Sequence, residues 1–420
     1  MESNLSQKTW KTTLSLILSG LGILYFLGQS VVLALVWLSL IITPVSGFSQ
    51  GSVLGLLVWS SILSAIILLP IFLISLYQQL GKPIPHWLDT DRPFIHKIAW
   101  WSLLIWPVLV LLGWLVSGSE MLSTLLLGLI NVLVAGIPVL WIYHAGQRNL
   151  KSGSQIRKWR IFGFSLTVLP MVILVVELIA ILVLVIMGSL FFAAQFSTKP
   201  GLEQQLLQFF DSIMSQTADP DALLTQVEPY LRQPAVIFVI LAIFAGIMPL
   251  IEEILKPLAL WTLAGSEISP QEGFVGGLLC GAGFALMENI LYFSTMITAE
   301  DWLFLAIGRA GTGVLHMLAS GLAGWGLARA WRDRKWGFLV LTTLASFILH
   351  GLWNALALLS GIAPFLLGRD VENVNFWQTL LYNLPVLILL ILSGFGLGFL
   401  NKHFRKQTTK SLLQVDGSQS

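Results

Sequence analysis

Long apolar runs separated by short polar segments dominate this chain. Crossing the hydrocarbon core of a bilayer takes about 20 apolar residues in a helix, and ten runs meet that requirement. The runs are continuous rather than alternating, which is typical of membrane helices and not of barrel strands. We therefore expect an all-α, polytopic membrane protein with ten transmembrane helices. The expected spans are residues 13–43, 52–80, 98–117, 121–143, 161–194, 234–264, 273–296, 302–330, 336–360 and 377–400.

Positive charges fall mainly on one side of these spans. Placing the N-terminus in the cytoplasm puts eighteen of the 23 Lys and Arg residues in cytoplasmic segments. The outer loops then hold only Lys199, Arg232 and Arg369. The remaining two, Lys256 and Arg309, lie inside spans. Because cytoplasmic loops of membrane proteins are enriched in Lys and Arg, the sequence predicts that both termini are cytoplasmic.

The composition agrees with this assignment. The 420 residues are 56% hydrophobic and only 10% charged, whereas a soluble domain has about 25% charged residues. The net charge is +2 and the basic residues are spread among loops, so we expect the lipid bilayer and no nucleic acid as a partner. Cys280 is the single cysteine, which excludes an intrachain disulfide. The first apolar run is longer than the 7–15 or so residues of a signal peptide, so we expect it to be retained.

The polar residues divide the chain into four parts. Residues 1–194 form a five-helix accessory membrane module, in which Glu177 is the one ionisable residue away from the helix ends. Residues 195–233 form an extracytoplasmic amphipathic connector with two short helices, which either lies on the outer leaflet or covers a substrate entrance. Residues 234–400 form a membrane core with most of the buried polar groups, and residues 401–420 form a polar cytoplasmic tail.

An acidic pair stands at the centre of that core. Glu252, Glu253 and Lys256 lie in the otherwise apolar segment PLIEEILKPLALW. A charge at the bilayer centre costs at least about 3 kcal/mol, so these residues indicate a functional site, with a structural ion pair as the alternative. Spacings of three and four residues bring a carboxylate near the ammonium. Pro257 lacks the N–H that would bond the Glu253 carbonyl, so we expect the helix to open there.

Three later spans carry further polar residues. The seventh has Glu288, with Asn289 next to its helix face, whereas Arg309 and His316 share one face of the eighth and His350 and Asn354 share one face of the ninth. Gly277 and Gly281 form a pair of small residues four apart, which allows close helix packing in lipid. Along a straight helix Glu252 lies about 27 Å from the outer end, deeper than His316. Either tilt or the proline kink brings the two residues level, or the site is a cavity open toward the cytoplasm.

These side chains suit the hydrolysis of a peptide bond. A carboxylate beside an imidazole can move a proton from water to a leaving amine, and Asn or Arg can donate to an oxyanion. The candidate catalytic residues are Glu252, Glu253, Glu288, His316 and His350, with Lys256, Asn289, Arg309 and Asn354 as supporting residues. Glu and His also bind zinc, so Zn2+ is the candidate cofactor, with Glu288, His316 and His350 as candidate ligands. The residues leave open whether a metal ion or a glutamate activates the water.

The chain resembles the PrsW family of intramembrane proteases and, more distantly, the CPBP/Abi superfamily of CAAX proteases. The resemblance covers about residues 235–400 and is carried by EEILK (252–256), FALMEN (284–289), RAGTGVLH (309–316) and HGLWN (350–354). It implies a PrsW-like protease core, of glutamic or metalloprotease type, that cuts membrane-associated proteins in the cell membrane. An anti-sigma-factor-like protein is one candidate substrate.

A proton-coupled membrane transporter is the main alternative, because intramembrane Glu and His residues also relay protons. Transporters usually contain paired repeats, however, whereas this chain has an apolar first half and a polar second half. A membrane scaffold with purely structural ion pairs is the third possibility.

Overall fold

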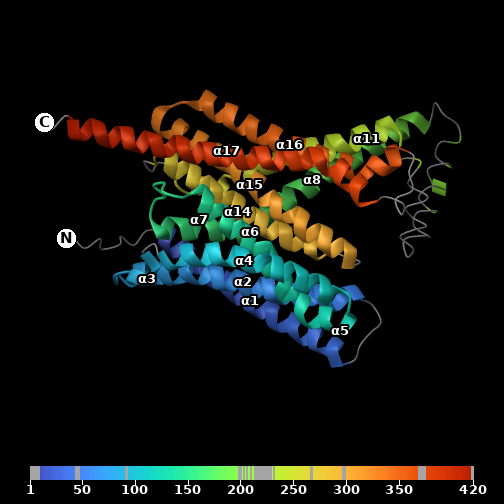
Figure 1. The fold of residues 1–420 in the computed structure, drawn as a ribbon, viewed down its shortest axis with the longest axis horizontal. Helices are drawn as coiled ribbons and strands as arrows, with labels where there is room; N and C mark the ends of the chain where they lie inside the picture. Colours follow the sequence, from blue (N-terminus) through green and yellow to red (C-terminus); the bar gives the residue numbers. More distant parts are fainter. Residues whose placement is uncertain are drawn as a thin grey trace. The chain divides into compact units, whose positions relative to one another are not determined.

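The computed structural model of the chain is 90% helical, and the residues that it describes contain no strand (Figure 1). The structure describes residues 10–42, 48–89, 93–196, 232–264, 268–295, 299–367 and 375–417, with a few isolated residues between 201 and 229. Ten helical stretches within these ranges are long and apolar enough to cross a membrane. They confirm the prediction of an all-α, multi-pass membrane protein.

The helices follow the predicted spans closely. In the first half they are α1 (Trp10–Ile42), α2 (Phe48–Gln79), α3 (His86–Asp89), α4 (Pro93–Ser117), α5 (Glu120–Leu122), η1 (Ser123–Leu127), α6 (Gly128–Gly146), α7 (Gln155–Thr167) and α8 (Leu169–Phe196). In the second half they are α11 (Pro234–Leu241), η2 (Ala242–Ile247), α12 (Met248–Leu255), α13 (Leu258–Trp261), α14 (Pro270–Phe293), α15 (Ala299–Asp333), α16 (Trp336–Leu366) and α17 (Phe376–Gly417). The last helix therefore continues beyond residue 400, where the predicted span ends.

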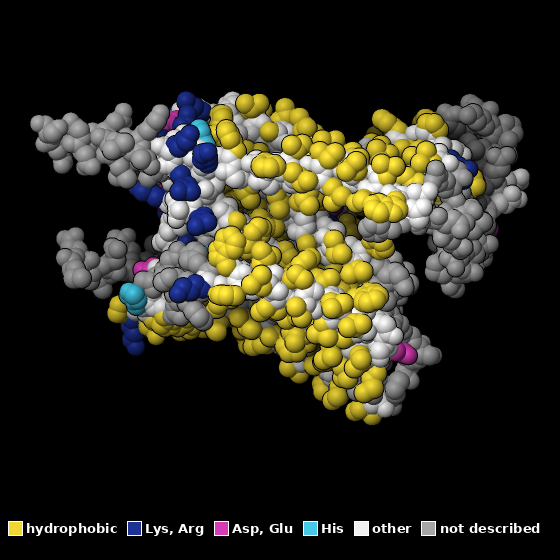
Figure 2. Space-filling view, viewed as in Figure 1, with side chains coloured by type: hydrophobic (Ala, Val, Ile, Leu, Met, Phe, Trp, Pro, Cys, Tyr) yellow, Lys and Arg dark blue, Asp and Glu magenta, His cyan; other side chains and the backbone are white. Residues whose placement is uncertain are grey.

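Two predictions about the segments outside the membrane stay predictions. One is the structure of the connector at 195–233, and the other is the cytoplasmic location of the termini. The connector at 195–233, with its second helix expected to begin near Asp221, lies outside the described residues except for its ends and a few isolated positions. On the face drawn in Figure 2, the Lys and Arg side chains gather at one end while hydrophobic side chains cover the helices beyond it. The positive-inside rule leads us to place that end in the cytoplasm.

The chain divides into two compact units. The first consists of Met1–Pro170, Glu253–Ser346 and Leu390–Ser420, and the second of Met171–Glu252 and Phe347–Leu389. Helices α8, α12, α16 and α17 each pass from one unit into the other. The candidate residues are distributed accordingly. The first unit carries Glu253, Lys256, Glu288, Asn289, Arg309 and His316, and the second carries Glu252, His350 and Asn354.

Helix α14 lies at the centre of the first unit. In its most apolar stretch 83% of the residues are buried, and its neighbours are α15, α7 and α6. A Cβ atom at Gly277 or Gly281 would collide with the backbone of α15, near Ser320 and His316 respectively. The two glycines therefore provide the close packing that their spacing predicts, and they set His316 directly against α14.

Two polar contacts join the N-terminal helices of the first unit to α14 and α15. The indole Nε1 of the buried Trp302 on α15 donates to Oδ1 of the buried Asn131 on α6, at 2.6 Å. Arg157 on α7 pairs with Glu272 at the start of α14, with 2.8 Å between Nη1 and Oε1. Helices α6 and α7 are therefore bonded directly to the helices that carry Glu288, Asn289, Arg309 and His316.

Candidate active site

The acidic pair lies near the end of helix α12. Glu252 and Glu253 are buried, with 7% and 0% of their surface exposed. The chain makes a turn at Lys256 and Pro257 before α13 begins, which confirms the opening predicted from the proline. Before α12, residues 242–247 form the π-helix η2. Wide turns of this kind are frequent at functional sites.

Lys256 is fully buried, and its ammonium lies between a carboxylate and an imidazole. The Nζ atom donates to Oε1 of Glu253 at 2.8 Å and lies 3.0 Å from Nδ1 of His316. The centre of the Phe284 ring is 4.2 Å from Nζ. A buried charge is costly unless it is paired and hydrogen-bonded, and here Glu253, three residues before Lys256, provides the pair.

The neighbours of His316 fix the position of its ring proton. Nε2 of His316 lies 2.7 Å from Oε2 of Glu288, and an ionised carboxylate can only accept, so Nε2 carries the hydrogen. Nδ1 faces the ammonium of Lys256, which can only donate. With Glu288 ionised and Lys256 protonated, these contacts correspond to the neutral tautomer that has its hydrogen on Nε2 and the lone pair of Nδ1 directed at Lys256.

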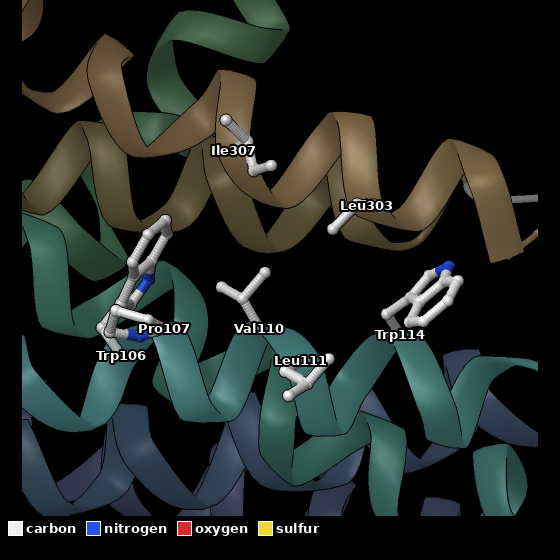
Figure 3. Close-up of a pocket in the computed structure, with 7 residues that line it drawn as sticks. All are labelled: Trp106, Pro107, Val110, Leu111, Trp114, Leu303 and Ile307. Atoms are coloured by element: carbon white, nitrogen blue, oxygen red, sulfur yellow. The ribbon is translucent and has the colours of Figure 1, made fainter.

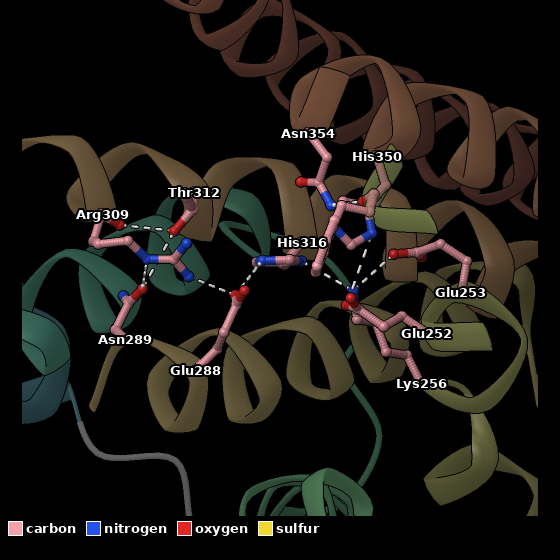
Figure 4. A network of polar contacts seen from close by, with 11 residues as sticks. Glu252, Glu253, Lys256, Glu288, Asn289, Arg309, Thr312, His316, His350 and Asn354 are labelled. Atoms are coloured by element: carbon pink, nitrogen blue, oxygen red, sulfur yellow. Dashed lines mark hydrogen bonds and ion pairs between the residues drawn. The ribbon is translucent and has the colours of Figure 1, made fainter. Parts of the chain in front are cut away.

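Arg309 holds Glu288 on the side away from His316. Its Nη2 lies 2.5 Å from Oε2 of Glu288, and its Nε donates to Oδ1 of Asn289 at 2.8 Å. The guanidinium carbon is 4.2 Å from the centre of the Tyr292 ring. The result is an unbroken series of polar contacts that runs along α14 and α15 to Lys256 (Figure 4).

Thr312 also belongs to this series, and it is not among the site residues predicted from the sequence. Its hydroxyl lies 3.3 Å from the Asn289 oxygen, as a donor, and 2.8 Å from the carbonyl of Arg309. The signal was present in the sequence, because Thr312 lies three residues after Arg309 and four before His316. Such spacings place it on the helix face that those two residues share.

The second unit contains a smaller set of contacts. Nδ1 of the buried His350 lies 3.9 Å from Oε2 of Glu252. Asn354, one turn further along α16, donates from Nδ2 to the carbonyl of Phe244 at 2.9 Å. Because Phe244 belongs to η2, this bond ties α16 to the π-helix that precedes the acidic pair.

The 3.0 Å contact between Lys256 and His316 brings the ammonium at the break after α12 to the imidazole on α15. The relative depth of Glu252 and His316 stays a prediction. Within the first unit the structure brings together Glu253, Lys256, Glu288, Asn289, Arg309 and His316. Within the second unit it brings together Glu252 and His350, with Asn354 bonded to η2.

The acidic and imidazole side chains fit a metal ion by donor type. Each unit holds one buried glutamate and one buried histidine, Glu253 and His316 in the first unit and Glu252 and His350 in the second, and zinc binds both kinds of donor. Glu288, which the sequence suggested as a ligand, is not among the residues that could hold a metal ion. It accepts from the far nitrogen of His316, which is where carboxylates stand behind the histidine ligands of metals.

A pocket of about 310 Å³ in the first unit lies between α4 and α15 (Figure 3). Its lining consists of Trp106, Pro107, Val110, Leu111, Trp114, Leu303 and Ile307. The polar groups among these side chains are two indoles, and the N–H of Trp106 already donates to the Val134 carbonyl at 3.0 Å. The pocket offers no acid, base or nucleophile, so we do not assign the chemistry to it.

Comparison with known proteins identifies the segment that carries these residues. Residues 219–390 match the family model described as PrsW family intramembrane metalloprotease. This range includes every predicted site residue and confirms the resemblance seen in the motifs. No curated protein and no solved structure matches the chain.

Proposed function

We propose that this chain, whose residues 219–390 form a PrsW-family protease domain, cuts membrane-associated proteins with water activated by its buried glutamates and histidines. The observation that carries the proposal is the polar series in the first unit. It consists of Arg309, Glu288, His316, Lys256 and Glu253, each in contact with the next. Ionisable groups are expensive inside a membrane and mark functional sites there.

The two glutamates of α12 have different tasks in this mechanism. Glu253 is committed to the ion pair with Lys256, so we assign proton transfer to Glu252, with His350 beside it. Glu252 takes a proton from water while the water oxygen bonds to the scissile carbonyl carbon. The proton then passes to the amide nitrogen as the C–N bond breaks. One water molecule is consumed in each cleavage. Its OH group ends in the new carboxyl group and its other hydrogen ends in the new amine.

The remaining polar residues position the site. Arg309 was predicted as an oxyanion donor, but its contacts with Glu288 and Asn289 favour a role in holding Glu288 against His316. Asn354 has a second amide hydrogen besides the one donated to Phe244, and we retain it as the candidate oxyanion donor.

A metal ion fits this arrangement, and Zn2+ is the candidate. Glu253 and His316 would hold it in the first unit, where Glu288 would fix the orientation of the His316 ring from behind. When bound, the ion would activate water and polarise the scissile carbonyl.

The substrates of an intramembrane protease are membrane proteins. A substrate of the anti-sigma-factor type and a location in the cell membrane are further parts of this proposal, and both are supported by the family resemblance.

Cleavage by the purified protein in liposomes tests the proposal. The substrates are synthetic peptides that form a single transmembrane helix and carry a dye and a quencher. We expect Glu252→Gln, His316→Ala and His350→Ala to lower the rate about 10²–10⁴-fold, the usual loss when acid–base catalysis is removed. Asp333→Asn removes a carboxylate at the end of α15 that pairs with Arg329 and Arg332 and should leave the rate unchanged. Wild-type rates in all three site variants would overturn the proposal.

Glu253→Gln distinguishes the two glutamates. It removes the carboxylate partner of the fully buried Lys256, and breaking such a pair costs about 3–5 kcal/mol. We therefore expect a lower melting temperature for Glu253→Gln and an unchanged one for Glu252→Gln, although both variants lose activity. Equal melting temperatures would contradict the assignment of separate tasks.

A further inference from the structure

The ammonium of Lys256 contacts two residues of the first unit that could hold a metal ion. It lies 2.8 Å from Oε1 of Glu253 and 3.0 Å from Nδ1 of His316, and one ligand atom of each of these residues lies within 4.8 Å of the other. We propose that Lys256 and a divalent metal ion, Zn2+ by donor chemistry, are alternative occupants of one position. The metal binds only after Lys256 withdraws. This inference rests on the proposed function, because it concerns the same site.

The lone pair of His316 makes the two occupants exclusive. Nε2 of His316 carries its hydrogen toward Glu288, so Nδ1 has the ring's one available lone pair. That lone pair can accept a hydrogen bond from Lys256 or bind a metal ion, but it cannot do both. The same carboxylate, Glu288, orients the ring for either partner.

The contacts of Lys256 hold it in this position, and its location in a turn of the chain allows it to withdraw. With Lys256 in place, Glu253 balances its charge and Phe284 packs against the ammonium as a cation–π partner. Lys256 also lies in the turn between α12 and α13, beside Pro257, which has no N–H. A flexible four-carbon stem at a helix break can move without unwinding a continuous helix.

The exclusion has a measurable consequence for metal affinity. When only a fraction of the protein is open to a ligand, the apparent affinity falls by that fraction. If Lys256 closes the site in 90–99% of molecules, the apparent affinity is about 10- to 100-fold weaker than that of the open site. Lys256→Met removes the competitor, so this variant should bind Zn2+ about 10- to 100-fold more tightly than the wild type.

The experiment titrates Zn2+ into the full-length protein in detergent against a competing chelator dye. Lys256→Met should show the gain in affinity, whereas Lys256→Arg, which keeps a cation, should stay within about threefold of the wild type. Arg157→Met removes a cation that pairs with Glu272 outside the site and should change nothing. If Lys256→Met does not give monodisperse protein, Lys256→Gln takes its place.

Two double variants test whether the gain arises at the predicted atoms. In the Lys256→Met background, Glu253→Gln and His316→Ala should each abolish the gain, whereas a general loss of positive charge would leave it intact. Equal Zn2+ affinities in Lys256→Met and the wild type, or a gain that survives the loss of both donors, would overturn the inference. Because the readout is metal binding without substrate, it is independent of cleavage. A protein with the gain but no peptidase activity would overturn the proposed function alone.

Discussion

Arg309 is held on three sides, and each contact uses a different feature of its guanidinium. One nitrogen pairs with Glu288, a second donates to Asn289, and the face of the group lies over Tyr292. A lysine offers a compact point charge and cannot make these three contacts at once. Arg309 therefore determines the direction in which Glu288 presents its carboxylate to His316.

Replacing Arg309 by lysine should separate positioning from charge. We expect Arg309→Lys to lower kcat about 10- to 100-fold, the usual effect of losing an outer partner of a catalytic or ligating group, with KM unchanged. The matched control is Arg332→Lys, which alters an exposed pair with Asp333 and should leave both constants unchanged. A purely structural role would instead reduce the amount of folded protein while kcat per folded molecule stayed at the wild-type value.

At the residue scale, the sequence could predict contacts within one helix but not contacts between helices. The pairing of Glu253 with Lys256 follows from their spacing, and Thr312 could have been found in the same way. The contact between Lys256 and His316 could not be predicted, because it depends on the relative depth and rotation of α12 and α15. Packing sets the depth and rotation of the two helices, whereas counting residues along straight helices placed Glu252 deeper than His316.

Between elements, the close approach of α14 and α15 is what positions His316. A Cβ at Gly281 would meet the carbonyl carbon and oxygen of His316 itself. The backbone of the histidine therefore rests directly on the glycine, and Glu288 projects from α14 two turns later to reach Nε2. The spacing between the two helices and the geometry of the imidazole are consequently coupled.

Gly281→Ala should therefore affect both stability and catalysis. The added methyl group must push α15 away, which costs about 1–3 kcal/mol for an overpacked core, and the shift moves His316 relative to Glu288. We expect a lower melting temperature and a cleavage rate reduced at least about tenfold. Gly308→Ala on α15 is the matched control, because a Cβ there would meet nothing within 4 Å. Equal behaviour of the two variants would show that the packing at Gly281 does not position the histidine.

The ten spans were predictable because burial in lipid imposes length and hydropathy on each helix separately. The break after α12 was predictable for a local reason, since Pro257 cannot donate to the carbonyl four residues earlier. The π-helix η2 was not, because its sequence AIFAGI contains no proline and is uniformly apolar. Its wide turn is instead accompanied by a tertiary bond, from Asn354 to the Phe244 carbonyl.

For the whole molecule, the question is whether the PrsW-family segment can stand alone. The matched range begins at residue 219, but the first compact unit also includes residues 1–170. Helix α14 is buried among neighbours that include α6 and α7. The indole of Trp302 would lose its hydrogen-bond partner, Asn131, if the N-terminal helices were absent, and an unsatisfied buried donor costs about 1–3 kcal/mol.

Dividing the chain within the 195–233 connector tests this dependence. We expect residues 213–420 expressed alone to aggregate or remain inactive, because the faces of α14 and α15 that pack on α6 would be left uncovered. Coexpression with residues 1–212 should restore a monodisperse complex and cleavage of the transmembrane peptides, since the cut lies in the connector between α8 and α11 and leaves the contacts of the first unit intact. The coexpressed pair thus controls for damage caused by the cut. If residues 213–420 alone cleave at the rate of the intact chain, the N-terminal helices are dispensable for catalysis, and the polar contacts at Trp302 and Arg157 serve stability only.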